Sequence, residues 1–503
     1  MDGTETELKL AVEAALLPRV VRVAAIDEHR SGRASALMLR STYFDTPDQL
    51  LAQAGVTVRL RRQGRAWTQT VKTAGERASG LFQRREWEVP VATAQLDVAH
   101  LLSTGLAVLQ AAGLTERLTP VFSTEVKRTL YCLTTPEWDV DLALDQGTIT
   151  AGGVSQPIAE VEMELGRGAP EVLFHLGREI AAALPCRLLA LSKSDRGFML
   201  AAGRESQPVK AQPLALDGGM RVIEAFQAIA RNCLAHLLIN EACLRGPHAM
   251  ESVHQMRVAL RRLRSAIKVF KPLLQGSELD DLREEMRWLL AHLGPARDGD
   301  VFLAEIIAPV VRRHAEAPAL AHLHAEWIAR RDRDFSQAVT AVDDRRFTLL
   351  LLRLGQWIAT GPWAESGMRD APVPDFARRV LKRQHRRLMR AGGGRLSRLA
   401  ADDLHQVRIL GKQMRYAGEF FSSLYPRSAT KPFLAMLAEL QEALGALNDL
   451  AVAGPKLASC HHQGDWAWAA GLVCGWHESR RPGLMADAEA AWKRLRKTDP
   501  FWE

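Results

Sequence analysis

Residues 5–9 read E-T-E-L-K, and this short stretch decides how the first 200 residues of the chain fold. Glu5, Glu7 and Lys9 alternate there with Thr6 and Leu8. In a helix the three charges would point in different directions, whereas in a strand they share one face at a spacing of about 6.5–7 Å. The stretch is therefore either a solvated edge strand or one wall of a charged cavity.

The same alternation returns in most of the strands that the sequence predicts up to about residue 203. For any one strand, a charged face that meets water is the more common explanation. Several such strands together favour a closed barrel with the charges inside, because like charges directly opposed in an open sheet would cost stability. The alternating charges are Arg59 and Arg61; Lys72; Arg84, Glu86 and Glu88; Asp141 and Asp145; Glu160, Glu162 and Glu164.

Inside such a barrel the two signs of charge would serve two ligands. Carboxylate oxygens suit hard divalent cations, and the set expected to hold them is Glu5, Glu7, Glu160, Glu162 and Glu164. Guanidinium and ammonium groups suit a polyanion, and the set expected to hold it is Lys9, Arg59, Arg61, Lys72, Arg84, Arg128 and Lys193. A lumen with both sets fits a metal-bound phosphate chain.

These residues lie in segments that resemble the CYTH family, the triphosphate tunnel metalloenzymes. E-T-E-L-K is similar to the family's ExExK signature, and eight further segments follow in the family's order: YFDTP, VRLRR, VKTAG, GLFQRREWE, FSTEVKRT, ALDQG, EVEMEL and LSKSDRG. The resemblance implies an eight-stranded antiparallel barrel that hydrolyses or cyclises triphosphates with Mg²⁺ or Mn²⁺. It also implies catalytic roles for Lys9, Glu86 and Asp145, the last two by fixing bases or ordering a water.

The second half of the chain contains an internal duplication. HQMRVALRRLRSAIKVF begins at His254, and HQVRILGKQMRYAGEFF begins at His405, an offset of 151 residues. Matched positions at one constant offset indicate two copies of one helical unit. The same offset joins Arg257 to Arg408, Arg261 to Lys412, Arg264 to Arg415, Gly294 to Gly445, and Asp298 to Asp449.

In each copy the bases recur every three or four residues and form one stripe of a helix without an interleaved acid. A third basic helix is predicted at VLKRQHRRLMR, residues 380–390. The pattern resembles the CHAD domain, the conserved-histidine α-helical domain, which implies two pseudo-symmetric bundles that bind inorganic polyphosphate. The expected polyphosphate-binding residues are His254, Arg257, Arg261, Arg264, Lys268, Lys382, Arg386, His405, Arg408, Lys412 and Arg415.

Together these patterns predict an α+β protein: an N-terminal eight-stranded antiparallel β-barrel tunnel with helices, then an all-α domain of two pseudo-symmetric helical bundles. The expected boundaries are residues 1–203 for the barrel, 204–217 for a linker and 218–503 for the helical domain. Two helical segments are expected within the barrel domain, near 13–23 and 171–184. Residues 1–200 hold 22 bases and 24 acids, whereas the remainder holds 44 and 34, which favours an anionic partner for the helical domain.

The six cysteines form no C-x-x-C pair, so reduced thiols are expected, and no run of about 20 apolar residues was found for a membrane span. The expected location is the cytoplasm, with polyphosphate granules as a candidate site, and a membrane partner is not expected. Nucleic acid is not expected either, because the basic helices carry few aromatic residues for base stacking.

The leading hypothesis is metal-dependent hydrolysis of inorganic triphosphate, with long-chain inorganic polyphosphate bound by the helical domain. One alternative keeps the tunnel but changes the substrate to thiamine triphosphate or a nucleotide, including cyclisation of ATP. The other is a non-catalytic polyphosphate-binding or granule-associated protein.

Overall fold

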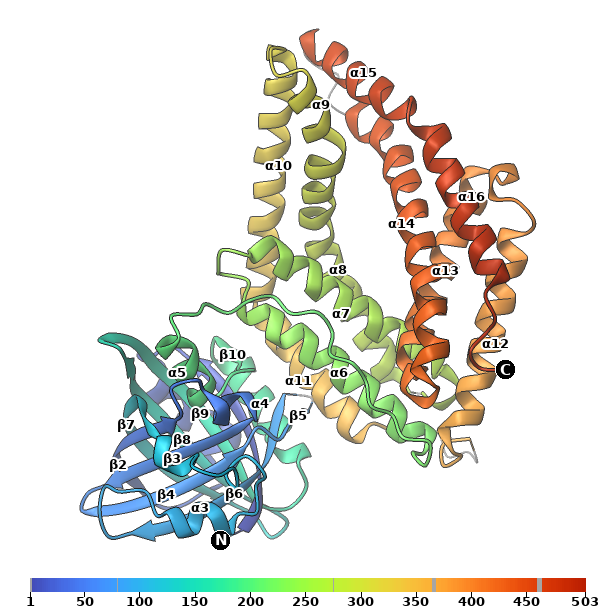
Figure 1. Cartoon of the computed structure of the whole chain (residues 1–503). Coiled ribbons are helices and arrows are strands. Elements are labelled where there is room, and N and C mark those ends of the chain that lie inside the picture. The colour runs from blue at the N-terminus through green and yellow to red at the C-terminus, as the bar shows by residue number, and fades with distance from the viewer. Residues whose placement is uncertain (1, 79, 275, 364–367, 459–463) are drawn as a thin grey trace. The chain divides into compact units, whose positions relative to one another are not determined.

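The computed structural model describes residues 2–78, 80–274, 276–363, 368–458 and 464–503 (Figure 1). The chain divides into two compact units. Unit 1 consists of Met1–Val209, Leu234–Ser252 and Ala341–Gly361, and unit 2 consists of Lys210–Cys233, Val253–Thr340 and Pro362–Glu503. Residues 204–217 form no helix or strand. The domain boundaries at 203 and 218 stay predictions.

Unit 1 contains a closed antiparallel barrel of eight strands in the order β1-β9-β8-β7-β2-β3-β4-β6, and pairing of β6 with β1 closes it. The E-T-E-L-K stretch lies in β1 between β6 and β9, so it is a wall of the barrel and not an edge strand. The short strands β5 and β10 extend the sheet. The strands are β1 Asp2–Val12, β2 Arg30–Asp45, β3 Val56–Gln63, β4 Ala66–Thr73, β5 Glu76–Ala78, β6 Leu81–Val91, β7 Thr119–Thr134, β8 Asp139–Ala151, β9 Val154–Arg167 and β10 Cys186–Leu188.

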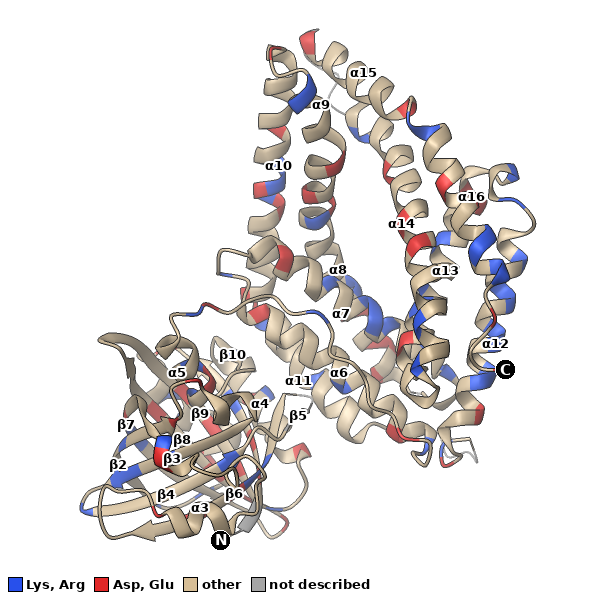
Figure 2. Cartoon of the chain, viewed as in Figure 1, with Lys and Arg blue, Asp and Glu red and all other residues tan. Residues whose placement is uncertain are grey.

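Figure 2 marks the charged residues on the strands. On β1, β3, β4 and β6 most of the residues that alternate with the lumen charges are apolar and buried, whereas β2 and β7 carry the exposed Arg40, Glu125 and Lys127 on their outer face. Val58, Val71 and Trp87 pack with Leu101 of α3 (Val98–Ser103). Leu8 is fully buried next to α4 (Glu171–Ala183). The alternation read from the sequence is therefore the alternation between core and lumen.

Toward one end of the barrel the inward face changes from charged to apolar. Tyr43 stacks on Phe122 at 4.3 Å between ring centroids, and Phe198 of α5 contacts the same Phe122 ring at 5.0 Å. Ile149 and Ile158 belong to this apolar cluster. The helix α5 is thereby fixed against the barrel, with its N-terminal residues at the charged lumen.

The helices of unit 1 connect or cover the strands. The segment expected near 171–184 is confirmed as α4, whereas the one near 13–23 is mostly a 3₁₀ helix with proline in its first turn, a form suited to short connections. They are η1 Leu17–Arg22, α1 Ala24–Asp27, α2 Leu50–Gln53, α3 Val98–Ser103, η2 Thr115–Arg117, α4 Glu171–Ala183, α5 Lys193–Ala201 and α11 Arg345–Thr360.

Unit 2 is helical, which confirms the predicted fold class of a barrel followed by a helical region. Its core includes Phe270, which stacks on Phe376 with centroids 4.8 Å apart and touches Phe226. Helices α6, α7 and α10 contribute residues to both units. The remaining elements are α6 Val222–Ala242, α7 Ala249–Val269, η3 Lys271–Leu273, α8 Ser277–Val301, the π-helix η4 Phe302–Ile307, α9 Ala308–Arg313, α10 Pro318–Asp343, α12 Val373–Gly392, η5 Leu396–Arg398, α13 Ala401–Phe421, η6 Ser422–Leu424, α14 Arg427–Ala458, α15 Gly464–Glu478 and α16 Arg481–Lys497.

The sequence leads to two expectations, that no segment could span a membrane and that the cysteines are reduced. In the described ranges one helix, α6, is long and apolar enough to cross a membrane, which corrects the expectation that no such run exists. Of its most apolar window 61% is buried, and core helices of globular proteins have the same length and composition. Free thiols are found at Cys132, Cys186, Cys233, Cys243 and Cys474, while Cys460 lies outside the described residues.

The packing of α5 against Phe122 gives a first testable prediction. A Cβ atom on Gly197 would lie 2.1 Å from the Phe122 ring, which is itself packed against Tyr43 and Phe198. We expect Gly197→Ala to lower the free energy of unfolding by about 1–3 kcal/mol, as overpacked cores do. Urea denaturation would measure it, with Gly394→Ala as the control, because a Cβ there meets no atom within 4 Å. An unchanged midpoint for Gly197→Ala would contradict this packing.

Candidate active site and anion-binding helices

The barrel encloses a cavity of about 630 Å³ lined almost wholly by polar side chains. Twelve of the fourteen residues predicted for the tunnel line it, and Asp145 and Glu160 do not. The twelve come from β1, β3, β4, β6, β7, β9 and α5: Glu5, Glu7, Lys9, Arg59, Arg61, Lys72, Arg84, Glu86, Arg128, Glu162, Glu164 and Lys193.

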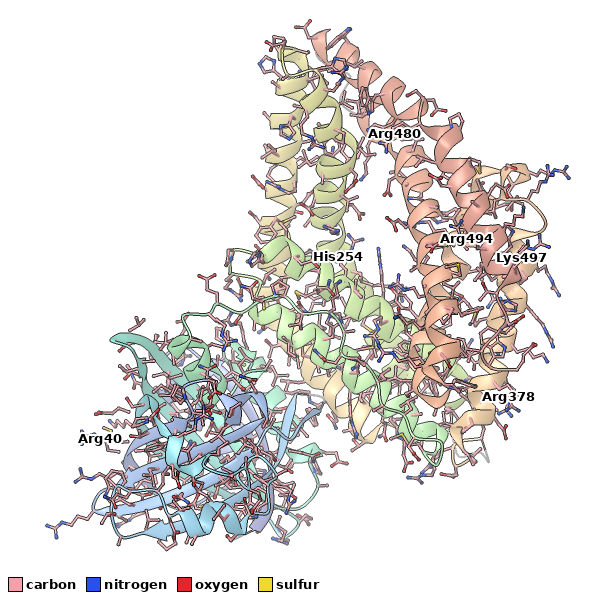
Figure 3. The ribbon with its side chains drawn as sticks, viewed as in Figure 1. Arg40, His254, Arg378, Arg480, Arg494 and Lys497 are labelled. Carbon is pink, nitrogen blue, oxygen red and sulfur yellow. The ribbon has the colours of Figure 1, made fainter. Side chains whose placement is uncertain are left out.

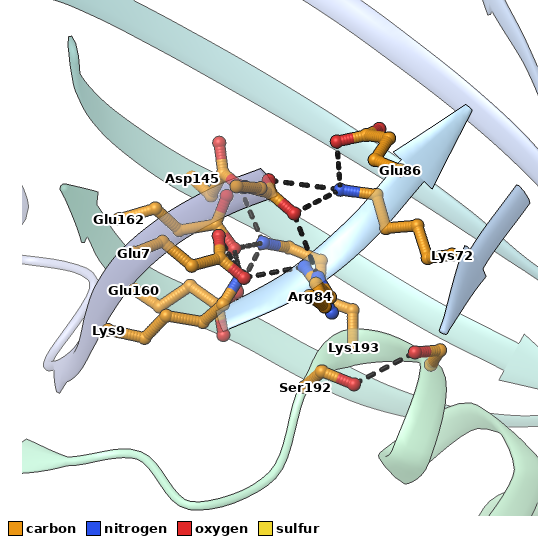
Figure 4. A network of polar contacts seen from close by, with 12 residues as sticks. Glu7, Lys9, Lys72, Arg84, Glu86, Asp145, Glu160, Glu162, Ser192 and Lys193 are labelled. Atoms are coloured by element: carbon orange, nitrogen blue, oxygen red, sulfur yellow. Dashed lines mark hydrogen bonds and ion pairs between the residues drawn. The ribbon is translucent and has the colours of Figure 1, made fainter. Parts of the chain in front are cut away.

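Around β1 the charges form a paired network (Figure 4). Glu5 accepts hydrogen bonds from Lys72 Nζ and Arg84 Nε, both at 2.8 Å, and Arg84 Nη2 donates to Glu7 at 2.5 Å. Lys72 also lies 3.0 Å from Glu86. Burial alone would raise the pKa of Glu5, but Lys72 and Arg84 lower that pKa to about 2. Glu5 is therefore ionised at any physiological pH.

Deeper in the wall, Asp145, Glu160 and Glu162 place carboxylate oxygens within 4.8 Å of one another, a spacing that could hold a metal ion. Lys193 already occupies this cluster: its Nζ lies 2.6 Å from Asp145 and 2.9 Å from Glu162, and it also pairs with Glu160 (Figure 4). Asp145 is fully buried. These acids are therefore neutralised by the chain itself and hold its bases in place.

Two guanidinium groups, those of Arg128 and Arg196, also bind the acids of this cluster. Arg128 donates from Nε and Nη2 to the two oxygens of Asp145, at 2.8 and 2.6 Å, and Arg196 donates to Glu160 at 2.5 Å. Burial would lower the pKa of Arg128, but its acidic partners raise it. The bidentate geometry fixes the orientation of Arg128 beside the cavity.

Glu164 differs from the other carboxylates. Its side chain is exposed to the lumen and forms no hydrogen bond or ion pair with any residue that the structure describes. It pairs in register with Glu7. Desolvation, together with the charges of Glu5 and Glu7, raises the pKa of Glu164 to about 7. A carboxylate held among like charges in this way fits a divalent cation, which would relieve their repulsion.

The structure adds lumen residues that the sequence analysis did not assign to the site. Tyr43 lines the cavity, and although burial would raise the pKa of its phenol, Arg59 and Arg61 lower it. Tyr43 pairs in register with Arg59 on β3, and periodicity along the sequence does not show this pairing. Arg196 was also missed, although it does not line the cavity: it lies one helical turn after Lys193 and pairs with Glu160. The other lumen residues are Thr4, Thr57, Thr68, Thr70, Glu88, Pro90, Ser192 and Ser194.

In unit 2 four of the predicted bases lie within electrostatic reach of one another: Arg257, Arg261, Arg408 and Lys412. Arg257 donates to Asp298 at 2.8 Å and to the Gly294 carbonyl at 2.6 Å. The matched Arg408 has a buried Nε without a hydrogen-bond partner among the described residues. Desolvation, with Arg408 and Arg261, lowers the pKa of Lys412 to about 8. We name these four residues the repeat cluster.

The other predicted residues of the helical domain lie in different surroundings. His254 lies on α7 (Figure 3), and His405 Nδ1 is 3.0 Å from Asn448. Arg415 donates to Glu419 at 2.7 Å and so turns away from the cluster. Arg264 and Lys268 continue the row of bases that begins with Arg257 and Arg261 on α7, and we name this row the α7 stripe. Lys382 and Arg386 lie on α12.

A closed barrel whose lumen carries both carboxylates and bases defines a protein that can bind a polyanion together with cations. Residues 3–198 match the CYTH domain and residues 228–458 match the CHAD domain. The chain thus contains a CYTH domain followed by a CHAD domain, which confirms both resemblances.

Known relatives cover the two domains separately and together. Over 199 residues the chain is 33% identical to an inorganic triphosphatase of Haemophilus influenzae; this is 39% of the chain and 54% of that relative, so the chain spans about half its length. An uncharacterized protein of Mycobacterium tuberculosis is 25% identical over 449 residues, which cover 82% of this chain and 81% of that protein. The crystal structure of the CHAD domain from the plant Ricinus communis is 34% identical, covers 59% of this chain and 98% of its own, and superposes with a TM-score of 0.51.

Proposed function

We propose that the barrel is an inorganic triphosphatase that hydrolyses tripolyphosphate to pyrophosphate and phosphate with Mg²⁺ or Mn²⁺. The observation that carries the proposal is the cavity of about 630 Å³ into which seven bases and several carboxylates converge. The likeness to the Haemophilus triphosphatase supports the same reaction. We also propose that the protein acts in the cytoplasm.

In this reaction the bases bind and orient the phosphate chain. Arg59 and Arg61 offer forked donors that match phosphate oxygens. The Nε and Nη2 donors of Arg128 are bound to Asp145, which fixes the direction of its guanidinium beside the cavity. Positioning and charge stabilisation supply most of the rate in phosphoryl transfer. Water adds to a terminal phosphorus, the bridging P–O bond breaks, and pyrophosphate leaves.

The residues that would hold a divalent cation are Glu5, Glu7 and Glu164. Glu164 lacks a cationic partner in the described chain, and Glu5 is already ionised. When bound, such a cation neutralises charge that develops on the phosphoryl oxygens. Asp145 and Glu160 are a poorer fit, because they do not line the cavity and Lys193 Nζ lies between them and Glu162.

We further propose that the helical domain binds inorganic polyphosphate at the repeat cluster. Four bases face two carboxylates there, Asp298 and Asp449, which leaves an excess of positive charge. The buried Nε of Arg408 finds no hydrogen-bond acceptor among the residues that the structure describes, which fits a guanidinium whose acceptor is a ligand.

Phosphate release from tripolyphosphate, pyrophosphate, ATP, thiamine triphosphate and long-chain polyphosphate tests the enzyme proposal. Each substrate is assayed with Mg²⁺, with Mn²⁺ and with chelator. Metal-dependent turnover selective for tripolyphosphate is the expected result. Selective turnover of an organic triphosphate would show that the substrate is that compound and not tripolyphosphate. If no substrate is turned over but polyphosphate binds tightly, the protein is a binding module.

The repeat cluster predicts a pH dependence of polyphosphate binding. Since the pKa of Lys412 is about 8, its ammonium loses its proton between pH 7 and 9, and a bound polyanion favours the protonated form. We expect affinity to fall roughly 3–10-fold over that range. Fluorescence anisotropy with labelled polyphosphate measures it. Lys412→Arg keeps its charge and should bind equally at both pH values, so an equal slope in that variant would contradict this assignment.

A further inference from the structure

A row of bases on α12 stands apart from the repeat cluster. Six side chains of this one helix line a shallow hollow of about 350 Å³: Arg379, Lys382, Arg383, Arg386, Arg387 and Arg390. All six are exposed, and none forms an ion pair or hydrogen bond with a described residue. From the first to the last they extend about 16 Å along the helix. We name them the α12 face.

The α12 face has no counterpart in the first repeat. The 151-residue offset that matches the bases of α7 with those of α13 aligns the six positions with Ala228, Arg231, Asn232, Ala235, His236 and Ile239 of α6. Only one of these is a base. The charge on α12 is therefore a property of one copy, and neither the duplication nor the fold requires it.

Packing does not account for the six charges either. α12 is held in unit 2 by its opposite side, where Val380, Leu381 and Leu388 are buried. Like charges four residues apart, as at Arg379 and Arg383, weaken a helix. An uncompensated row of this kind is explained by a ligand that supplies the missing negative charge.

The α12 face lies next to the end of the α7 stripe. Burial and the neighbouring Arg387 lower the pKa of Lys268, so the last base of α7 and the α12 face share one electrostatic field. Phe270, which directly follows α7, stacks on Phe376 of α12 with ring centroids 4.8 Å apart. A flexible anion bound along α7 can therefore continue onto α12.

We propose that the α12 face is a second polyanion site, used by phosphate chains long enough to engage the α7 stripe and α12 together. This rests on the proposed polyphosphate binding and adds a preference for long chains to it. The face consists of guanidinium and ammonium groups without exposed amide or aromatic side chains, so it contacts phosphates and reads no base. A plain phosphate chain fits it better than nucleic acid does.

The test removes four charges from the full-length protein by Arg379→Gln, Arg383→Gln, Arg387→Gln and Arg390→Gln, and it leaves the predicted Lys382 and Arg386 in place. The matched control removes four exposed bases elsewhere in unit 2 by Arg312→Gln, Arg313→Gln, Lys493→Gln and Lys497→Gln; Lys497 projects from α16 (Figure 3). Binding is measured over a salt series with polyphosphate of ~100 and of ~5 phosphates, and with duplex DNA.

For the α12 variant we expect at least a tenfold loss of affinity for the long chain at 0.1 M salt and a salt slope smaller by about 3, because fewer phosphates are neutralised. Affinity for the short chain and tripolyphosphate hydrolysis should stay within twofold, and the control should match the wild type. Arg383→Glu with Arg387→Glu, on the same exposed face, should repeat the result and guards against a folding defect in either variant.

Four outcomes would overturn the proposal. Equal loss for both chain lengths would make α12 part of one undivided site, and no loss for either would leave the face without this ligand. Loss of DNA binding with polyphosphate affinity retained would make nucleic acid its partner. Wild-type protein that binds no polyphosphate would overturn the proposed function of the helical domain as well, so the two failures are distinguishable.

Discussion

Replacing Glu5 and Glu7 together with glutamine is expected to lower the rate of tripolyphosphate hydrolysis by about 1,000-fold or more. Glu5 is ionised at any physiological pH, Glu7 pairs in register with Glu164 on the neighbouring strand, and the charges of Glu5 and Glu7 both act on Glu164. Glutamine keeps the shape of each side chain but removes the charge that a divalent cation requires. The measurement is phosphate release at saturating Mg²⁺ or Mn²⁺.

The control exchanges two carboxylates that do not line the cavity, Glu125→Gln with Glu137→Gln, and should leave the rate unchanged. Polyphosphate binding should persist in the Glu5/Glu7 variant, because the repeat cluster and α12 belong to unit 2. Because Lys72 and Arg84 lose their ionised partners in this variant, thermal unfolding is measured to show that the variant is still folded. A folded variant that retains more than a tenth of the activity would refute the assignment of these carboxylates.

The sequence was sufficient to find the lumen because a strand places every second side chain on one face whatever its partners are. Taking every second residue from Glu5 or Arg59 therefore separates the charged from the apolar positions, even when the pairing of the strands is unknown. The constant offset between His254 and His405 likewise revealed two copies of one helical unit. Both inferences depend only on local periodicity.

How deeply each charged side chain is buried, and which residues it pairs with, could not be derived in this way. The sequence does not say that Asp145 lies outside the cavity lining or that Lys193 lies among three acids. Nor does it say that Glu164 forms no ion pair with any described residue, because these facts follow from strand register and from the position of α5. On the helices, Arg415 follows the basic stripe but pairs with Glu419 one turn later. Periodicity selects a face, whereas tertiary contacts decide which residues on that face remain available.

Replacing Lys193 with methionine is expected to lower the free energy of unfolding by about 3–5 kcal/mol at pH 7.5, because it leaves buried carboxylates without their ammonium partner. Asp145 is fully buried and Glu160 nearly so, and both lie against Lys193 Nζ. Burial acts to raise the pKa of Asp145, and Lys193 is foremost among the groups that lower it. Urea denaturation gives the loss, with the exposed Lys127→Met as the control.

The cause of that loss can be separated from a loss of packing. Without Lys193 the pKa of Asp145 and that of Glu162 rise, so the folded variant takes up protons as the pH falls from 7.5 to 5.5 and recovers part of its stability relative to the wild type. Mn²⁺ should also stabilise the variant, because three carboxylates within 4.8 Å can then bind it in place of the ammonium. A difference from the wild type that is independent of both pH and Mn²⁺ would show that Lys193 acts by filling space and not by its charge.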